Sequence, residues 1–328
     1  MPSAAKRLGV SIATYTIRWG SKTDTQRFPR WKDALDVLEH CQKLGAGCLQ
    51  IGVNGWESDF AGQVRDKRES LGIVLEGQIG LPKTEADVAR FESSLRAAKE
   101  AGVGVLRVTC LGTRRYETFD SLEAWQRFKE QSWTSLTLAE PVVRRHRVKL
   151  AVENHKDWRV DEQVALLKRL GSEWVGVNLD LGNNLALLED PLAVVEALAP
   201  LTFTTHFKDM AVQACDDGFL LSEVPLGDGF FDLKRMKEIC ERANPAVQFN
   251  LEMITRDPLR VPVLGRKYWT TFSDLPASAL ARALALVKQN PPKQPLPKVA
   301  GKSPEERLAF EEANNVKSFA FARERLGL

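Results

Sequence analysis

Four short apolar runs follow one another along the chain, and each ends in an acidic residue or a histidine. They are KLAVE at 149–153, VGVNLD at 175–180, LTFTTH at 201–206 and VQFNLE at 247–252. Runs of this kind are typical of strands in a parallel sheet that is buried on both faces. Because strand ends in a (β/α)8 TIM barrel meet on one face, we expect Glu153, Asp180, His206 and Glu252 to lie together there.

Three carboxylates and one imidazole on the same face would repel one another without a cation between them, and a divalent metal ion suits these donors. The separations of 27 and 26 residues between the first three positions match about one strand–helix–strand unit. The step from His206 to Glu252 is 46 residues, so an insertion is expected there. The segment 210–229 is polar, and we predict a specificity loop or lid with Gly218, Gly227 and Gly229 as candidate hinges.

The rest of the chain alternates between strand and helix patterns, which predicts an α/β fold with a parallel sheet. Strand-like runs at 8–14, 48–53, 71–79 and 103–109 precede the four described above, and 275–289 is the predicted eighth helix. We therefore predict a TIM barrel domain over 1–289. Residues 290–298 are Pro-rich and should be extended, and Ser303 with Pro304 and Glu306 indicates a helix start. This C-terminal helical extension, within 290–328, should pack on the barrel or on a partner subunit of a homo-oligomer.

Composition narrows the class of protein. The 328 residues carry a formal charge of +3 without a basic cluster, which does not favour nucleic acid as a partner. Five cysteines without CxxC spacing are typical of reduced thiols. The start of the chain, MPSAAKRLGVSIATY, lacks a signal-peptide pattern, and no apolar run is long enough to cross a membrane. A cytoplasmic protein without membrane contact is the expectation.

The motifs AVENH (151–155), NLDLGN (178–183), THFKD (205–209), PLGDGFFD (225–232) and NLEM (250–253) resemble those of the xylose isomerase-like TIM barrels, the sugar phosphate isomerase/epimerase superfamily. The resemblance implies that Glu153, Asp180, His206 and Glu252 bind one metal ion. It also implies that Glu153 and Glu252 are the catalytic pair that exchanges a proton of a carbohydrate substrate. Mn²⁺, Mg²⁺ or Co²⁺ would suit these ligands best, with Zn²⁺ and Fe²⁺ as alternatives.

Three functions fit this resemblance to different degrees. The first is isomerisation or epimerisation of a sugar or keto-sugar through an enediolate, and the second is a lyase or dehydratase reaction on a keto-sugar or keto-inositol with the same site. The ketose epimerases carry a histidine where this chain has Asn183 and an arginine where it has Val212, which changes the expected substrate. The third, endonuclease IV-like DNA repair, needs a His-rich zinc cluster, whereas this chain has four histidines in all.

Six further residues are candidate substrate contacts. His155 follows Glu153 by two residues, and Lys208 follows His206 by two; the alternative for Lys208 is an ion pair, for example with Asp209. Asn183 either binds a sugar hydroxyl or caps the following helix. Glu76 and Arg107 are polar residues within barrel strands, and they either face the pocket or pair with each other. Trp158, which follows a barrel strand, either stacks on the sugar or packs under the loops.

Overall fold

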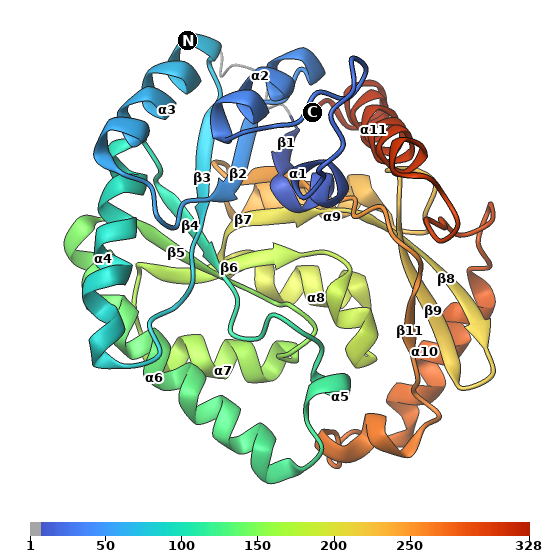
Figure 1. Cartoon of the computed structure of the whole chain (residues 1–328). Helices are drawn as coiled ribbons and strands as arrows, with labels where there is room; N and C mark the ends of the chain where they lie inside the picture. Colours follow the sequence, from blue (N-terminus) through green and yellow to red (C-terminus); the bar gives the residue numbers. More distant parts are fainter. Residues whose placement is uncertain (1–7) are drawn as a thin grey trace.

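The computed structural model describes residues 8–328, and its central feature is a closed barrel of eight parallel strands (Figure 1). The strand order around the barrel is β1-β10-β7-β6-β5-β4-β3-β2. The predicted TIM barrel is therefore confirmed. Its strands are β1 (Gly9–Ser11), β2 (Cys48–Gly52), β3 (Val74–Gln78), β4 (Val105–Val108), β5 (Lys149–Glu153), β6 (Val175–Asp180), β7 (Thr202–Phe207) and β10 (Gln248–Leu251).

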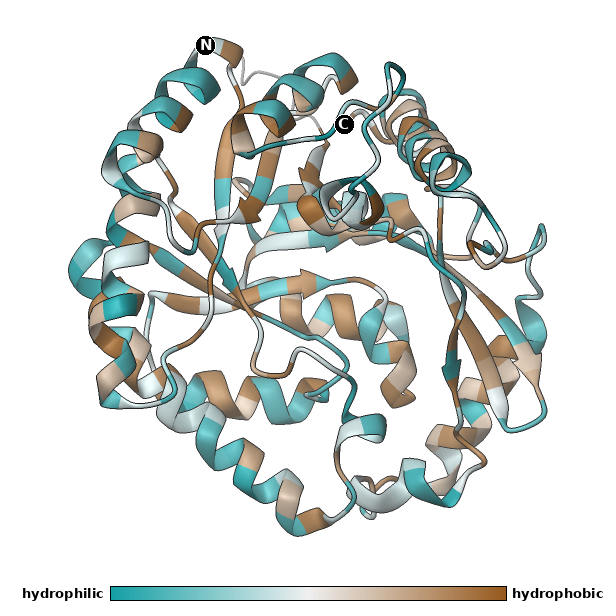
Figure 2. Ribbon diagram, in the orientation of Figure 1, coloured by the Kyte–Doolittle hydropathy of each residue, from teal (hydrophilic) through white to brown (hydrophobic). Residues whose placement is uncertain are grey.

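Helices surround the barrel, and most carry an apolar face toward the strands and a polar face toward solvent (Figure 2). Their ends follow local capping rules: Thr84 and Asp87 form a capping box at one N-terminus, and Gly45 ends another helix in the left-handed conformation. The outer helices are α2 (Ala34–Leu44), α3 (Ser58–Leu71), α4 (Glu85–Glu100), α6 (Leu122–His146), α7 (Val160–Leu170), α8 (Pro191–Leu198), α9 (Leu233–Ala243) and α11 (Pro304–Phe321).

The predicted loop at 210–229 is wrong in its structure, because most of this segment is a β-hairpin. Strands β8 (Asp209–Cys215) and β9 (Gly218–Val224) pair antiparallel, and β11 (Leu259–Val261) adds a third strand. Gly218 is required by this sheet, since a Cβ there would lie 2.2 Å from the Val261 carbonyl oxygen. Gly227 likewise sits tightly against the Phe321 ring. These two glycines therefore allow close packing.

The helix predicted at 275–289 is present, but its predicted place as the eighth barrel helix is wrong. Helix α10 (Ala277–Gln289) covers the added sheet, and its Ala279, Ala283 and Val287 share a second hydrophobic core with residues of β8, β9 and β11. Phe319 of α11 and Leu326 just after it belong instead to the main core around the barrel strands. Helix α11, which lies beside α1 and near α2, therefore takes the eighth-helix position (Figure 1).

Polar contacts fix α11 on the barrel as well. Ser303 and Glu306 form the predicted capping box at its start. Both carboxylate oxygens of Glu311 accept hydrogen bonds from backbone amides of the short helix α1 (Thr16–Trp19), at 2.7 and 2.9 Å. Asn315 bonds the hydroxyl and the carbonyl oxygen of Thr14. The C-terminal helix thus packs on its own barrel.

Within residues 8–328, no helix is long and apolar enough to span a membrane. The stretch in which no signal peptide was expected begins at residues 1–7, which lie outside the described part of the chain.

Candidate metal centre

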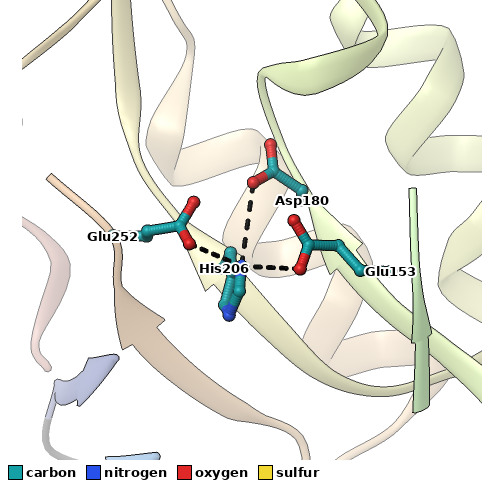
Figure 3. A group of neighbouring side chains, drawn as sticks. All are labelled: Glu153, Asp180, His206 and Glu252. Atoms are coloured by element: carbon teal, nitrogen blue, oxygen red, sulfur yellow. Dashed lines mark ion pairs between the residues drawn. The ribbon is translucent and has the colours of Figure 1, made fainter. Parts of the chain in front are cut away.

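Glu153, Asp180, His206 and Glu252 come together at the carboxyl ends of their strands (Figure 3). Glu153 and Asp180 are the last residues of β5 and β6, His206 lies near the end of β7, and Glu252 follows β10 directly. His206 Nδ1 lies 3.1 Å from Glu252 Oε1, 3.4 Å from Glu153 Oε2 and 3.8 Å from Asp180 Oδ2. The three carboxylates thus surround one ring nitrogen from different directions.

The group is buried and compact. Three of the side chains are fully buried, and Glu252 is nearly so. One potential ligand atom from each residue lies within 4.8 Å of the others. Divalent ions bind oxygen and nitrogen at roughly 2.0–2.6 Å, so ligands on opposite sides of an ion are separated by about 4–5 Å. The spacing therefore fits one ion bound by all four residues.

The orientation of His206 supports the same reading. Its Nε2 lies 2.7 Å from the Oε1 atom of Gln50, and its Nδ1 has no hydrogen-bond partner. The Gln50 amide is fixed in turn, because its Nε2 donates to the Glu76 carboxylate at 3.1 Å. Gln50 Oε1 is thus the acceptor, His206 Nε2 carries a proton, and the Nδ1 electron pair points at the carboxylates.

Asp180 is held by backbone and amide groups. Its Oδ1 accepts from the backbone amides of Gly182 and Asn183 at 2.9 and 2.8 Å. The side chain of Asn154 bonds both the backbone amide and the carbonyl of Asp180 at 2.8 Å. Oδ2, the atom toward His206, is left for the ion pair with Lys208 at 2.7 Å.

Two cations balance part of the negative charge. Arg107 pairs with Glu153, and Lys208 pairs with both Asp180 and Glu252. Lys208 thus forms the ion pair that was one of its predicted alternatives, but its partner is not Asp209. That carboxylate instead accepts backbone amide protons from Met210 and from residues 227, 229 and 231.

The pKa values of the four clustered residues are shifted by burial and by the neighbouring charges. Burial alone would raise the pKa of Glu153, but Arg107 and His206 hold it well below its usual range. Burial would also raise the pKa of Glu252, but His206 and Lys208 lower it to about 2. Burial raises the pKa of Asp180 to about 6, with the neighbouring carboxylates adding to it despite Lys208. Glu252 and Glu153 raise the pKa of His206 against the effect of burial.

These shifts mean that the site attracts positive charge at His206 Nδ1. A single proton there could point at only one of the three carboxylate oxygens, whereas a metal ion could bind all of them. The donor set is therefore suited to a divalent ion.

The other predicted site residues take different positions. Glu76 lies in the barrel interior and accepts hydrogen bonds from Gln50, Thr204 and Asn250 at 2.7–3.1 Å. It does not pair with Arg107, which binds Glu153 instead. Glu76 is therefore placed to support the buried polar side chains beneath the centre, since its Oε2 accepts from three donors there.

Asn183 and His155 both border the centre. Asn183 Nδ2 donates to Glu153 Oε1 at 3.1 Å, and its Oδ1 accepts from Lys156. The Nδ1 atom of His155 lies 2.9 Å from the Leu111 carbonyl oxygen, so it carries the proton and Nε2 is the free acceptor. Burial lowers the pKa of His155 to about 4, which keeps the ring neutral.

Trp158 is not at the centre. Its ring packs against Trp125 and Phe128 with centroids 5.3 and 5.5 Å apart, which matches the predicted alternative of packing under the loops. It also borders a cavity of about 520 Å³ between α6 and α7. That cavity, and another of about 500 Å³ between α8 and α10, contain none of the four clustered residues.

Sequence reasoning missed several residues near the centre. Gln50 is a polar residue within an apolar strand, and that pattern could have indicated it. Lys156, Tyr116, Glu223 and Arg256 lie in loops, a short helix and the added sheet, so no strand pattern indicates them.

Residues 77–271, more than half of the chain, match the model of the family described as xylose isomerase-like TIM barrel. The chain belongs to this family. A D-psicose 3-epimerase solved in the presence of D-fructose superposes with a TM-score of 0.63 at 15% identity, covering 98% of this chain and 100% of that one. The IOLI protein with a zinc atom bound superposes with a TM-score of 0.54 at 15% identity, covering 86% and 96%. At these identities the two structures show the shared fold.

A curated protein offers a more specific comparison. The 3-oxo-isoapionate decarboxylase of Pectobacterium atrosepticum is 25% identical over 232 residues, which span 69% of this chain and 78% of the relative.

Proposed function

We propose that the protein is a divalent-metal-dependent isomerase or epimerase of a sugar or keto-sugar, working by α-proton abstraction through an enediolate. The observation that carries the proposal is the unpartnered Nδ1 of His206, which faces three buried carboxylates. Membership of the xylose isomerase-like family supports it.

Glu153, Asp180, His206 and Glu252 would hold the ion, with Mn²⁺, Mg²⁺ or Co²⁺ favoured by the three carboxylates and Zn²⁺ or Fe²⁺ as alternatives. A divalent ion bound there stabilises the negative charge that develops on adjacent sugar oxygens when the α-proton leaves.

Glu153 and Glu252 are the proposed proton-transfer pair. They approach the centre from opposite sides of His206 (Figure 3). One carboxylate would remove the α-proton, and the other would return a proton to the opposite face of the carbon. Arg107 and Lys208 keep both carboxylates charged and therefore ready to accept a proton, although the same ion pairs weaken them as bases.

Loss of CO₂ from a 3-oxo sugar acid is the second candidate. The cations that weaken both glutamates as bases favour it, because decarboxylation needs no proton abstraction. The relative that is a 3-oxo-isoapionate decarboxylase favours it as well. In that reaction the bond between the carboxylate carbon and the α-carbon breaks, CO₂ leaves, and the electron pair forms an enediolate that then takes up a proton.

Product analysis separates these reactions. Mn²⁺-loaded protein is incubated in D₂O with ketoses and with 3-oxo sugar acids, and products are followed by NMR and mass spectrometry. Deuterium at the α-carbon of an otherwise unchanged ketose supports epimerisation or isomerisation, release of CO₂ supports the second candidate, and loss of water indicates a dehydratase.

The variants Glu153→Gln and Glu252→Gln test the proton-transfer roles. Each keeps the side-chain shape and removes the base, so turnover should fall at least about 10²-fold while substrate binding is largely kept. Unchanged deuterium exchange in both variants would exclude these residues and direct attention to Lys208 or His155.

A further inference from the structure

Lys156 is a buried cation without an anionic partner. The residue is 4% exposed, and its Nζ donates to the amide oxygen of Asn183. Among residues 8–328 no carboxylate lies within ion-pair distance of this ammonium group. The other buried or half-buried cations of this face are paired: Arg107 with Glu153, Lys208 with Asp180 and Glu252, Arg256 with Glu223, and Arg115 with Glu162. Burying an unpaired charge costs several kcal/mol, so Lys156 indicates a binding role.

The backbone at Lys156 supports this reading. Its φ is +60°, in the left-handed region that residues with a Cβ rarely adopt. Such conformations cost about 1–3 kcal/mol and are concentrated at functional sites. The surrounding structure holds the strained residue in place, because the backbone amide of Arg115 donates to the Lys156 carbonyl oxygen at 3.0 Å.

A donor without any hydrogen-bond partner lies in the same region. Tyr116 follows Arg115 in the short helix α5 (Arg115–Thr118), and its buried hydroxyl has no hydrogen-bond partner. The backbone bond from Arg115 to the Lys156 carbonyl oxygen brings the residue before Tyr116 against Lys156. The Arg256–Glu223 pair lies at the same face, because Glu223 is 4.0 Å from the ammonium group of Lys208 at the metal centre. A buried hydroxyl without an acceptor and a buried ammonium group without an anionic partner suit the same anionic ligand.

Arg256 completes the group and opens it to solvent. Its Nε and Nη2 bind Glu223 at 3.2 and 2.6 Å, and Nη1 makes no side-chain bond in the described residues. The side chain is 30% exposed, unlike those of Lys156 and Tyr116. Arg256 is therefore the member of the group that a ligand from solvent would meet first.

The group lies next to the metal centre. The amide of Asn183 bonds Lys156 through its oxygen and Glu153 through its nitrogen, so a single amide separates the ammonium group from a proposed metal ligand. A substrate with adjacent oxygens at the centre and an anionic group a few bonds away could span both places.

We infer that Lys156, Tyr116 and Arg256 form an anion subsite, which binds the carboxylate or phosphate group of an acidic sugar substrate. This inference rests on the proposed function, because it assigns a substrate class to the same site. It selects acidic sugars over the neutral ketoses, and Asn183 becomes the link between the two subsites.

The test compares three compounds of one sugar: D-arabinonate, D-arabinose 5-phosphate and the neutral D-arabinitol. Binding to Mn²⁺-loaded protein is measured by calorimetry for the wild type, Lys156→Met, Tyr116→Phe and the control Lys234→Met, which removes an exposed lysine of α9. At least one acidic compound should bind wild type and control more than 10-fold tighter than arabinitol. Lys156→Met should abolish this preference, and Tyr116→Phe should reduce it. The acidic compound that binds more tightly shows whether the subsite prefers a carboxylate or a phosphate group.

Stability and metal binding provide independent readouts. Met keeps the length of Lys156 and its backbone strain. Removal of the unpaired buried charge stabilises the ligand-free protein, and loss of the bond to Asn183 opposes this, so Lys156→Met should melt close to the wild-type temperature. Mn²⁺ affinity is measured separately by electron paramagnetic resonance. If the wild type does not bind Mn²⁺, the proposed metal-dependent function is refuted. The preference for acidic compounds is then measured on the protein as isolated, so the two proposals are tested separately. Equal affinity for all three compounds, or a preference unchanged in Lys156→Met, would overturn the inference.

Discussion

Replacing Gln50 by Leu tests whether a buried amide controls the metal centre from beneath. Gln50 Oε1 lies 2.7 Å from His206 Nε2, and its Nε2 is anchored on Glu76. Leu has a similar size but no acceptor. The imidazole would then lose the bond that keeps its proton on Nε2 and its electron pair on Nδ1, and we expect weaker metal binding as a result.

The size of the effect follows from that single lost bond. Removing a hydrogen-bond partner of a metal-binding histidine typically weakens metal affinity by about 10–100-fold, or about 1.4–2.7 kcal/mol. Protein stability should fall as well, because Asn178 Oδ1 loses the amide donor of Gln50. Mn²⁺ affinity is therefore measured by titration on folded protein, with the folded fraction checked by circular dichroism.

Thr204→Val is the matched control. It removes the 2.7 Å bond from the Thr204 hydroxyl to Glu76 in the same buried polar layer but leaves the Gln50–His206 contact in place. We expect reduced stability and nearly normal Mn²⁺ affinity. If Gln50→Leu binds Mn²⁺ within about twofold of wild type, or if both variants lose affinity equally, the proposed control of the histidine tautomer is wrong.

Three further predictions concern metal, backbone and pH. His206→Ala and Asp180→Ala should each lose stoichiometric Mn²⁺ by elemental analysis, and full retention by both would exclude these ligands. Gly227→Ala should destabilise the fold by about 1–3 kcal/mol in urea unfolding, because the φ of Gly227 is +91° and a Cβ would lie 2.3 Å from the Phe321 ring of α11. Gly301 has a similar φ of +81° but no atom within 4 Å of an added Cβ, so Gly301→Ala should destabilise the fold less. Burial raises the pKa of Glu311 to about 8, so the folded state binds this proton more tightly than the unfolded chain. Its contribution to stability is then greatest below about pH 4.5 and is lost toward pH 8, and Glu311→Gln should flatten the dependence of Tm on pH in that window; coincident curves would contradict this.

The barrel and the four clustered residues could be predicted because both depend on local patterns. Strands β5 and β6 have the predicted bounds, since their apolar runs each end in a carboxylate and are largely buried. In a parallel barrel the carboxyl ends of all strands lie on the same face. The position of a functional residue at a strand end can therefore be predicted without knowledge of its contacts. The metal-binding role of the group stays a prediction until an ion is measured.

The identity of the eighth helix could not be predicted from the sequence, because two segments were suited to that position. Helices α10 and α11 both carry apolar residues, and each needs a surface to cover. The added sheet decides between them: β8 and β9 turn Met210, Val212, Phe219 and Leu221 toward α10. The alternation of these residues was the available signal, but the acidic turn at 216–217 made the segment look like a polar loop.

The charged residues around the centre show where one-dimensional reasoning ends. Arg107 and Lys208 were found because they lie in or just after strands, yet their partners depend on which carboxylates the barrel places opposite them. Lys156 and Arg256 approach from loops after β5 and β10, and their relation to Asn183 and Glu223 exists only in the folded chain. The contrast between them is informative, because Arg256 has a carboxylate partner and Lys156 has none. A buried charge that the fold leaves unpaired is more readily explained by a ligand than by stability, and that ligand must then be an anion.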